Sequence, residues 1–258
     1  MMMSLFRPAS PPDLAILDNH RPLIRSLSRR GLFRGTFSLG ALVALTGCDV
    51  SNDASVQSAL RAVSAWNDKV QAWLFDPKKL APTYPASMVQ KPPRFNAYYD
   101  IEHVKPVDGR DWKLEVSGRV ADRSPWTIER LAALPQYDEI IQHICTEGWS
   151  YIGEWSGPRL SDFLDRVGAD TRARYLYFTT ADDYPTSIDM PSARHPQTLL
   201  AMTYARQTLA DPFGYPVRLR TSTKIGYKNA KWLTSIEVTN EYKPGYWEKR
   251  GFNWFNGL

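Results

Sequence analysis

The sequence lacks the short motifs with which several common classes of enzyme bind their cofactors or metals. It contains no Gly-x-Gly-x-x-Gly fingerprint, no P-loop, no His-Glu-x-x-His and no Gly-x-Ser-x-Gly. Cys-x-x-Cys and the haem-attachment motif Cys-x-x-Cys-His are absent as well. These motifs serve dinucleotides, phosphates, zinc, nucleophilic serines, redox thiols and haem. Their absence therefore argues against each of those familiar types of site.

Cysteine itself is scarce, since Cys48 and Cys145 are the only two among 258 residues. Iron–sulfur clusters are held by several cysteine thiolates. If Cys48 is removed or modified during export, one cysteine is left, and this chain alone cannot hold such a cluster. Cys145 then has no disulfide partner in an oxidising compartment, so its presence there needs another explanation.

An excess of charge of one sign is missing from most of the chain. The net charge of +5 comes mainly from residues 1–47, which hold six arginines and two acidic residues, so the remainder carries only +1. No basic stripe with interleaved aromatic residues stands out, and nucleic acid is therefore not an expected partner. Hydrophobic residues make up 43% and aromatic residues 12% of the chain, which is enough for a packed core.

Long hydrophobic runs are absent too. The apolar run over residues 37–45 is too short to span a bilayer. The pair Arg29 and Arg30 precedes it, and an arginine pair before a short apolar run is typical of a twin-arginine signal. We therefore predict a twin-arginine signal segment over residues 1–47 and a periplasmic protein. An ordinary apolar helix with a chance pair of arginines is the alternative.

The end of this segment, Leu45-Thr46-Gly47-Cys48, resembles a lipoprotein cleavage box. In such a box the cysteine is acylated after cleavage and anchors the protein to a membrane. Membrane anchoring through a lipidated Cys48 therefore stands beside plain cleavage as an alternative.

Hydrophobic periodicity predicts an α+β fold with few helices and many short strands. A helix is expected over residues 54–75 and a Pro-rich surface strap over 77–93. No βαβ repeat is evident. Further elements are expected as follows: helices at 125–134 and 160–167, and strands at 112–120, 139–144, 175–180, 187–190, 217–220 and 233–240. After the signal segment, we predict an N-terminal helix and strap over 48–93 and one large domain over 94–258.

The segment 140–150 combines a predicted strand with Cys145 and a following Thr-Glu-Gly-Trp sequence. A thiolate is a soft ligand that suits a transition metal, and a nearby cation keeps it deprotonated. Two alternatives remain open. Cys145 could be a buried structural residue, because free cysteines are commonly buried. It could also be a nucleophile paired with His143, although the two-residue spacing places both on one face of a strand without fixing a catalytic contact.

Motifs over most of residues 94–258 occur in the order and at the spacing found in a known family. They are Asn96-Ala97-Tyr98-Tyr99-Asp100, Cys145-Thr146-Glu147-Gly148-Trp149, Thr180, His195-Pro196-Gln197-Thr198-Leu199, Gly214-Tyr215-Pro216-Val217-Arg218 and the stretch from Lys224 to Leu233. With them the chain resembles the sulfite oxidase fold family of molybdopterin-dependent oxidoreductases. Within that family it is most similar to the branch of the periplasmic methionine sulfoxide reductase catalytic subunit.

This resemblance implies a sulfite-oxidase-like mixed α/β domain that binds one molybdenum–molybdopterin cofactor. It implies that Cys145 is the catalytic residue and the protein's ligand to molybdenum. Cofactor contacts are implied for a second group of residues: Asn96, Tyr99, Asp100, Thr180, Arg218, Asn229, Ala230 and Lys231. A guanidinium can form a two-pronged contact with phosphate oxygens, and an ammonium supplies a point charge. The alternatives are a surface salt bridge for Arg218 and a solvated face for Lys224 and Lys228.

Two residues depart from the sulfoxide reductase pattern. Phe213 stands where that branch has Asn, and His143 stands where it has Arg. Either change could alter the substrate pocket or the potential of the metal. Residues 146–152 also contain no Arg or Lys, so a sulfite-binding anion pocket receives less support.

The reaction implied by the resemblance is oxygen-atom transfer, with reduction of a sulfoxide as the leading hypothesis for a small-molecule substrate. Oxidation of a small anion such as sulfite is the second hypothesis. A catalytically silent envelope lipoprotein that keeps the fold as a binding module is the third. The chain carries no second redox centre, so electrons must be exchanged with a membrane or periplasmic electron-transfer protein. In the related sulfoxide reductase system this partner is a membrane haem protein.

Overall fold

The computed structural model describes residues 54–257. The chain divides into two compact units, residues 1–61 and residues 62–258. Helix α4 (Ala54–Leu74), which the periodicity predicted over 54–75, crosses the boundary between them. Arg29, Arg30 and Cys48 lie outside the described residues, so the signal segment stays a prediction. None of the described helices is both long enough and apolar enough to cross a membrane.

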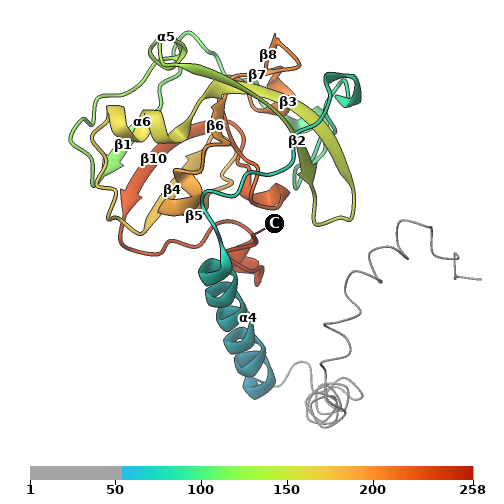
Figure 1. Ribbon diagram of the computed structural model, residues 1–258, viewed down its shortest axis with the longest axis vertical. Helices are drawn as coiled ribbons and strands as arrows, with labels where there is room; N and C mark the ends of the chain where they lie inside the picture. Colours follow the sequence, from blue (N-terminus) through green and yellow to red (C-terminus); the bar gives the residue numbers. More distant parts are fainter. Residues whose placement is uncertain (1–53, 258) are drawn as a thin grey trace, which may run out of the picture. The chain divides into compact units, whose positions relative to one another are not determined.

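The first sheet of the second unit has the strand order β1-β10-β4-β5 (Figure 1). Its strands are β1 (Glu115–Gly118), β10 (Leu233–Thr239), β4 (Tyr175–Thr180) and β5 (Thr186–Asp189). β1 pairs parallel with β10, and the other pairs are antiparallel. Fully buried and half-buried residues alternate along β4, which places one face of this sheet against the core.

The second sheet contains a long hairpin. β2 (Gln136–Ile144) and β3 (Ser150–Pro158) pair antiparallel along their whole length, and the hairpin curves away from the first sheet (Figure 1). β7 (Thr203–Tyr204) and β8 (Gln207–Thr208) extend it in the order β2-β3-β7-β8. A separate pair consists of β6 (Thr198–Ala201) and β9 (Arg218–Thr221), in which every residue is buried.

Three short helices contribute buried residues to the core. α5 (Ile128–Ala132) begins after Thr127, whose hydroxyl accepts a hydrogen bond from the N–H of Arg130. α6 (Leu160–Arg166) packs against β6. α7 (Met190–Ala193) is capped by the Asp189 carboxylate. Single 3₁₀ turns lie at Ala86–Met88, Ile101–His103, Asp211–Phe213, Gly226–Lys228 and Glu248–Arg250.

The main core cluster joins the first sheet to α5 and α6. Leu131, Phe163 and Phe178 are fully buried within it. The Trp126 ring meets the Phe163 ring edge-on with 5.0 Å between centroids. A buried aromatic side chain of this size contributes about 3–5 kcal/mol when compared with alanine. This core therefore holds the first sheet in place, and with it the loop after β4 that contributes Asp182 and Tyr184 to the pocket described below.

The predicted α+β class is confirmed, and so are the expected elements from 139 onward, within a few residues of their predicted ends. The strand expected at 112–120 shortens to β1, and the helix expected at 125–134 shortens to α5. The predicted strap at 77–93 is extended and lies along the hairpin, where Tyr84 N–H donates to the Ile140 carbonyl and Gln90 N–H to the Ile152 carbonyl.

Strands β3, β6, β7 and β8 do not follow from the sequence pattern. In β3, Gly153, Gly157 and Pro158 lower the strand propensity, and pairing with β2 overrides it. A side chain at Gly157 would collide with the carbonyl oxygen of Leu200. That glycine is therefore needed for the close approach of β3 to β6.

Candidate functional site

Cys145 lies at the tip of the β2–β3 hairpin, in a turn that its following residues hold. Its N–H donates to the Trp149 carbonyl at 2.9 Å, and the Gly148 N–H donates to the Cys145 carbonyl at 3.2 Å. Gly148 has a φ of +84°, in the left-handed region that favours glycine. The Glu147 carboxylate accepts a hydrogen bond from the Trp149 indole N–H at 2.7 Å. The Thr-Glu-Gly-Trp sequence after the cysteine is therefore a turn that positions Cys145.

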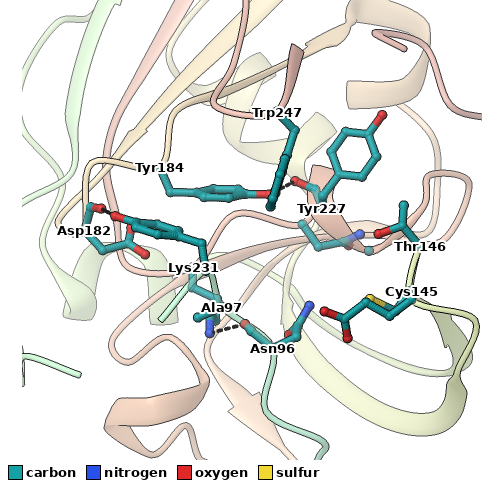
Figure 2. A pocket seen from close by; sticks show the side chains of 13 residues that line it. Asn96, Ala97, Cys145, Thr146, Asp182, Tyr184, Tyr227, Lys231 and Trp247 are labelled. Carbon is teal, nitrogen blue, oxygen red and sulfur yellow. Dashed lines mark hydrogen bonds between the residues drawn. The ribbon is translucent and has the colours of Figure 1, made fainter. Parts of the chain in front are cut away.

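The cysteine is buried and lines a pocket between this turn and the loops that follow β4 and β9 (Figure 2). Figure 2 shows Cys145 and Thr146 at one end of the pocket and Asp182 at the other. Aromatic rings from Tyr184 and Trp247 lie along the wall between them. The pocket therefore combines a thiol at one end with a largely aromatic wall.

Four of the predicted site residues meet at this pocket: Asn96, Cys145, Asn229 and Lys231. The Lys231 ammonium donates to the Asn96 carbonyl at 2.7 Å and lies 4.3 Å from the centroids of the Phe95 and Trp232 rings. The Asn229 side chain accepts from the Thr221 N–H at 2.7 Å. These residues come from three distant parts of the chain, which the fold brings together at one pocket.

The other predicted residues do not line the pocket. Tyr99 donates its hydroxyl to the Asp182 carboxylate at 3.1 Å, and Thr180 accepts from the Tyr184 N–H at 2.8 Å. Both thus hold the loop whose residues 182 and 184 do line it. Ala230 is buried in the main core cluster. Asp100 is exposed at the start of a 3₁₀ turn and makes no capping bond with its side chain.

Arg218 is buried behind the pocket beside a second arginine that the sequence motifs did not single out, Arg220. Arg218 donates to the Phe213 carbonyl at 2.9 Å and to the Asn229 carbonyl at 3.2 Å. Arg220 donates to the Asn229 side chain at 2.9 Å and to the Gln142 carbonyl at 2.8 Å. Both guanidiniums thus hold the loop around Asn229 in place.

These two guanidiniums lie close to the indole of Trp155, with the Arg218 carbon 4.6 Å and the Arg220 carbon 5.9 Å from the ring centroid. Within residues 54–257, neither forms an ion pair with an acidic side chain. Burial lowers the pKa of each to about 10. A surface salt bridge, the alternative considered for Arg218, is therefore wrong.

His143 occupies the space between this pair and the cysteine turn. It is 1% exposed, and neither ring nitrogen has a hydrogen-bond partner in the described part of the chain. A Cβ atom at Gly226 would lie 3.0 Å from its Nε2 atom, so the imidazole lies directly against the pocket wall. Burial, followed by the charges of Arg220, Arg218 and Lys231, holds its pKa well below the usual value. A hydrogen-bonded pair with Cys145 is not formed.

The remaining lysines of this region are also buried, which overturns the alternative of a solvated face. Lys224 is 2% exposed, with its ammonium 3.0 Å from the Phe255 ring centroid and 3.4 Å from the Asp189 carboxylate. Lys228 is fully buried and donates to the Glu248 carboxylate and to the Ser187 carbonyl at 3.0 Å. The stretch 218–231 therefore brings five basic side chains into the interior.

This burial predicts how the stability of the cofactor-free protein depends on pH. Burial lowers the pKa of Lys231 to about 6 and that of Lys224 to about 7. The folded protein therefore binds fewer protons than the unfolded chain above those values and below the ordinary lysine pKa of 10.5. Stability must then rise with pH across that window. We expect the thermal midpoint to increase by roughly 3 °C or more between about pH 7 and about pH 9.

Differential scanning fluorimetry of protein made without cofactor measures this slope. The Lys231→Met variant is the control, and it should show a flatter dependence because one of the lysines with a lowered pKa is gone. A midpoint that falls over the same interval would contradict the lowered pKa values of these lysines.

A mixed α+β domain that encloses a single-cysteine pocket and buries several cations behind it is suited to an anionic prosthetic group. Over residues 101–247 the chain matches the family described as the oxidoreductase molybdopterin binding domain. The chain belongs to this family. The resemblance to molybdopterin-dependent oxidoreductases of the sulfite oxidase fold is thereby confirmed, and the protein is an oxidoreductase that binds molybdopterin.

Individual relatives agree with this membership. The chain is 52% identical over 230 residues to the putative protein-methionine-sulfoxide reductase subunit YedZ1 of Azospira oryzae, covering 89% of this chain and 88% of that one. It is 28% identical over 156 residues to the protein-methionine-sulfoxide reductase catalytic subunit MsrP of Campylobacter jejuni, covering 54% and 52%. The solved sulfane dehydrogenase SoxCD from Paracoccus pantotrophus has the same fold, with a TM-score of 0.50, 22% identity and coverage of 54% and 40%.

The site fits such a cofactor, which carries a phosphate and a metal-binding dithiolene. The Nε atoms of Arg218 and Arg220 and both ring nitrogens of His143 are buried without a partner in the described range. Each unsatisfied buried donor costs about 1–3 kcal/mol. An anion with several acceptor oxygens would satisfy the two guanidinium N–H groups and the one N–H of the neutral imidazole. Cys145 is the only cysteine among residues 54–257 and is free to bind a metal as thiolate.

Proposed function

We propose that this protein reduces a sulfoxide to a thioether by oxygen-atom transfer. The overall reaction takes up two electrons and two protons and releases water. When bound, the molybdenum cofactor supplies the redox chemistry. The single observation that carries the proposal is the placement of the buried Cys145 in an aromatic-walled pocket backed by unpaired cations. The names of the Azospira and Campylobacter relatives point to the same substrate class.

In this proposal some residues of the chain hold the cofactor and others shape the pocket around it. Arg218, Arg220 and Lys231 hold the cofactor's anionic end, and Cys145 binds the metal as thiolate. Asn96 and Asn229 lie at the same pocket. The Asn96 amide orients the ring system, and Asn229, whose amide is bonded to Thr221, Arg220 and Ile225, shapes the pocket wall. Tyr99 and Thr180 do not line the pocket. They act indirectly, by holding the loop that contains Asp182 and Tyr184.

The aromatic wall suits a neutral sulfur substrate better than an anion. Rings of Tyr98, Tyr184 and Trp247 line the pocket, and sulfur makes favourable contacts with aromatic edges. Two carboxylates, Glu147 and Asp182, line it against the one amine of Lys231. This balance of charge disfavours a small anion such as sulfite, the second hypothesis from the sequence.

The test of this proposal begins with metal content. Protein purified from a host that makes the cofactor should contain about one molybdenum per chain, because Cys145 and the buried cations surround one site. Elemental analysis of the native protein measures it, together with an assay of a reduced dye against methionine sulfoxide and an assay of sulfite against an oxidised electron acceptor. Trace metal in a correctly folded preparation, or turnover of sulfite alone, would overturn the proposed function.

We also propose where the protein works and with what. Its signal segment directs it to the periplasm through the twin-arginine route, which carries folded proteins and so allows the cofactor to be inserted first. Electrons come from a separate membrane or periplasmic protein, because the described chain offers one redox site. The names of the Azospira and Campylobacter relatives include "subunit" and "catalytic subunit", which supports an assembly with a second protein.

The twin-arginine assignment predicts an export defect. Replacing Arg29 and Arg30 together with Lys should leave the precursor in the cytoplasm, since that route depends on the arginine pair rather than on charge alone. Fractionation and immunoblotting of cytoplasm and periplasm measure the distribution. The Arg21→Lys/Arg25→Lys double variant is the matched control and should be exported normally. Normal delivery of the Arg29/Arg30 variant would show that another route is used.

A further inference from the structure

Within the second unit, one face of α4 contacts residues 253–257. Ser64, Asp68 and Gln71 lie on this face about one helical turn apart, Ser64 acting through its backbone carbonyl and the other two through their side chains. The Asp68 carboxylate accepts the N–H groups of Trp254 and Phe255 at 2.9 Å each. Gln71 accepts from the Gly257 N–H at 3.2 Å, and the Ser64 carbonyl from the Asn253 side chain at 3.2 Å. This face of α4 is therefore committed to polar contacts.

The opposite face carries an apolar stripe. It consists of Val63, Trp66, Val70, Trp73 and Leu74, whose spacing of three and four residues places them along one side of the helix. Trp66 is 65% exposed and Trp73 is 82% exposed, and Val63 and Leu74 are exposed to a similar degree. An amphipathic helix normally buries its apolar face, but here the polar face is docked and the apolar face is left open.

The surroundings of the stripe are basic. Lys69 lies one turn from both tryptophans, at i+3 from Trp66 and i−4 from Trp73, and is exposed. Lys78 and Lys79 follow the helix and are exposed as well, and they outnumber the one exposed acid beside them, Asp76. The one acidic side chain of the helix, Asp68, is used by its two backbone contacts. A bilayer with anionic headgroups complements this pattern of tryptophan, aliphatic and lysine side chains.

We propose that the α4 stripe binds the surface of an anionic phospholipid bilayer, lying in the headgroup region without crossing the membrane. Tryptophan is enriched at that depth because its ring is apolar and its N–H remains hydrated. The sequence before α4 agrees with this occupant, since Cys48 in its lipoprotein-like box stands six residues before Ala54. An acyl chain there and the stripe would be two signals for the same surface, and stable anchoring takes two.

A second copy of the chain fits the stripe less well. The stripe covers twelve residues, which is about 18 Å of helix, and a stable protein interface buries about 1,200–2,000 Å². Two such short stripes packed together would fall well below that area.

Vesicle binding tests this contact without the acyl chain. The mature chain over 48–258 with Cys48→Ser contains the whole second unit and is mixed with vesicles of equimolar phosphatidylethanolamine and phosphatidylglycerol. We expect it to sediment with the vesicles, and the Trp66→Ser/Trp73→Ser variant to bind about tenfold or more weakly. The two residue types have similar helix propensity, and both tryptophans are already exposed, so the fold should be kept. Circular dichroism and the thermal midpoint verify this.

The matched control is the Met88→Ser/Ile101→Ser variant, which removes two exposed apolar side chains outside the stripe and should bind like the parent. No sedimentation of the parent chain would overturn the proposal. So would equal loss in the control, or full binding by the double tryptophan variant. A dimer in size-exclusion chromatography that the double tryptophan variant abolishes, with no vesicle binding, would assign the stripe to a second copy instead.

Discussion

Replacing Cys145 with Ser is expected to abolish turnover while leaving much of the pterin bound. A serine hydroxyl is a harder and far less acidic ligand than a thiol, so it does not replace the thiolate at the metal. The cofactor's anionic end is held elsewhere, by Arg218, Arg220 and Lys231. The hairpin turn should persist, because the bonds that hold it run between the backbone atoms of residues 145, 148 and 149.

The effects of Cys145→Ser on activity, on the absorption spectrum and on pterin content can therefore be measured separately on one sample. Activity should fall by at least about a thousandfold, the thiolate-to-metal absorption band should disappear, and bound pterin, measured by fluorescence after release, should remain above about half. If Cys145 were only a core residue, the Ser variant would lose stability by burying a hydroxyl but would keep its colour and activity. An active, fully coloured Ser variant would remove Cys145 as the ligand.

The second large effect is expected for Arg218. Replacing it with Met keeps the unbranched apolar stem but removes the buried charge. Because the guanidinium also bonds the Phe213 and Asn229 carbonyls, the variant loses both a charge for the cofactor and the support of the Asn229 loop. We expect molybdenum and pterin content to fall together, to about a tenth or less of the parent, since each charge-assisted hydrogen bond contributes about 1.5–3 kcal/mol.

Two further variants, Arg218→Lys and Arg110→Met, distinguish the effect of the Arg218 charge from a general loss of stability. The Lys variant keeps the charge but cannot reach both carbonyls in the same plane, so intermediate loading is expected. Arg110→Met removes an exposed guanidinium that pairs with Asp108, two residues away, and should load normally. Full cofactor content in Arg218→Met, with the fold verified by its thermal midpoint, would show that this arginine serves only the apoprotein.

The pocket residues that the sequence analysis singled out all lie in short, characteristic sequence motifs. The Thr-Glu-Gly-Trp string after Cys145 is a turn whose Gly148 needs a left-handed φ, and local backbone rules are readable from sequence. Asn96, Asn229 and Lys231 meet at the pocket as the family resemblance implies. Their roles toward the cofactor stay predictions.

Other contributions could not be found in this way because they depend on contacts between distant segments. Arg220 is set by its contacts with Gln142 and Asn229, although its two-residue spacing from Arg218 on one buried strand was a signal for it. Tyr184 and Trp247 reach the pocket from loops that no local pattern connects. Ala230 and Asp100 belong to the sequence motifs that predicted the site, but Ala230 is buried in the core and Asp100 is exposed to solvent.

The hydrogen bonds between Asp68 and the N–H groups of Trp254 and Phe255 have a consequence for biosynthesis. The helix is made early, but these two partners follow Asp68 by 186 and 187 residues. A ribosome must therefore add residue 255 before the carboxylate can accept both bonds, and a product truncated before residue 254 would leave it without these partners. Docking of α4 through Asp68 is thus a step that a shortened product cannot complete.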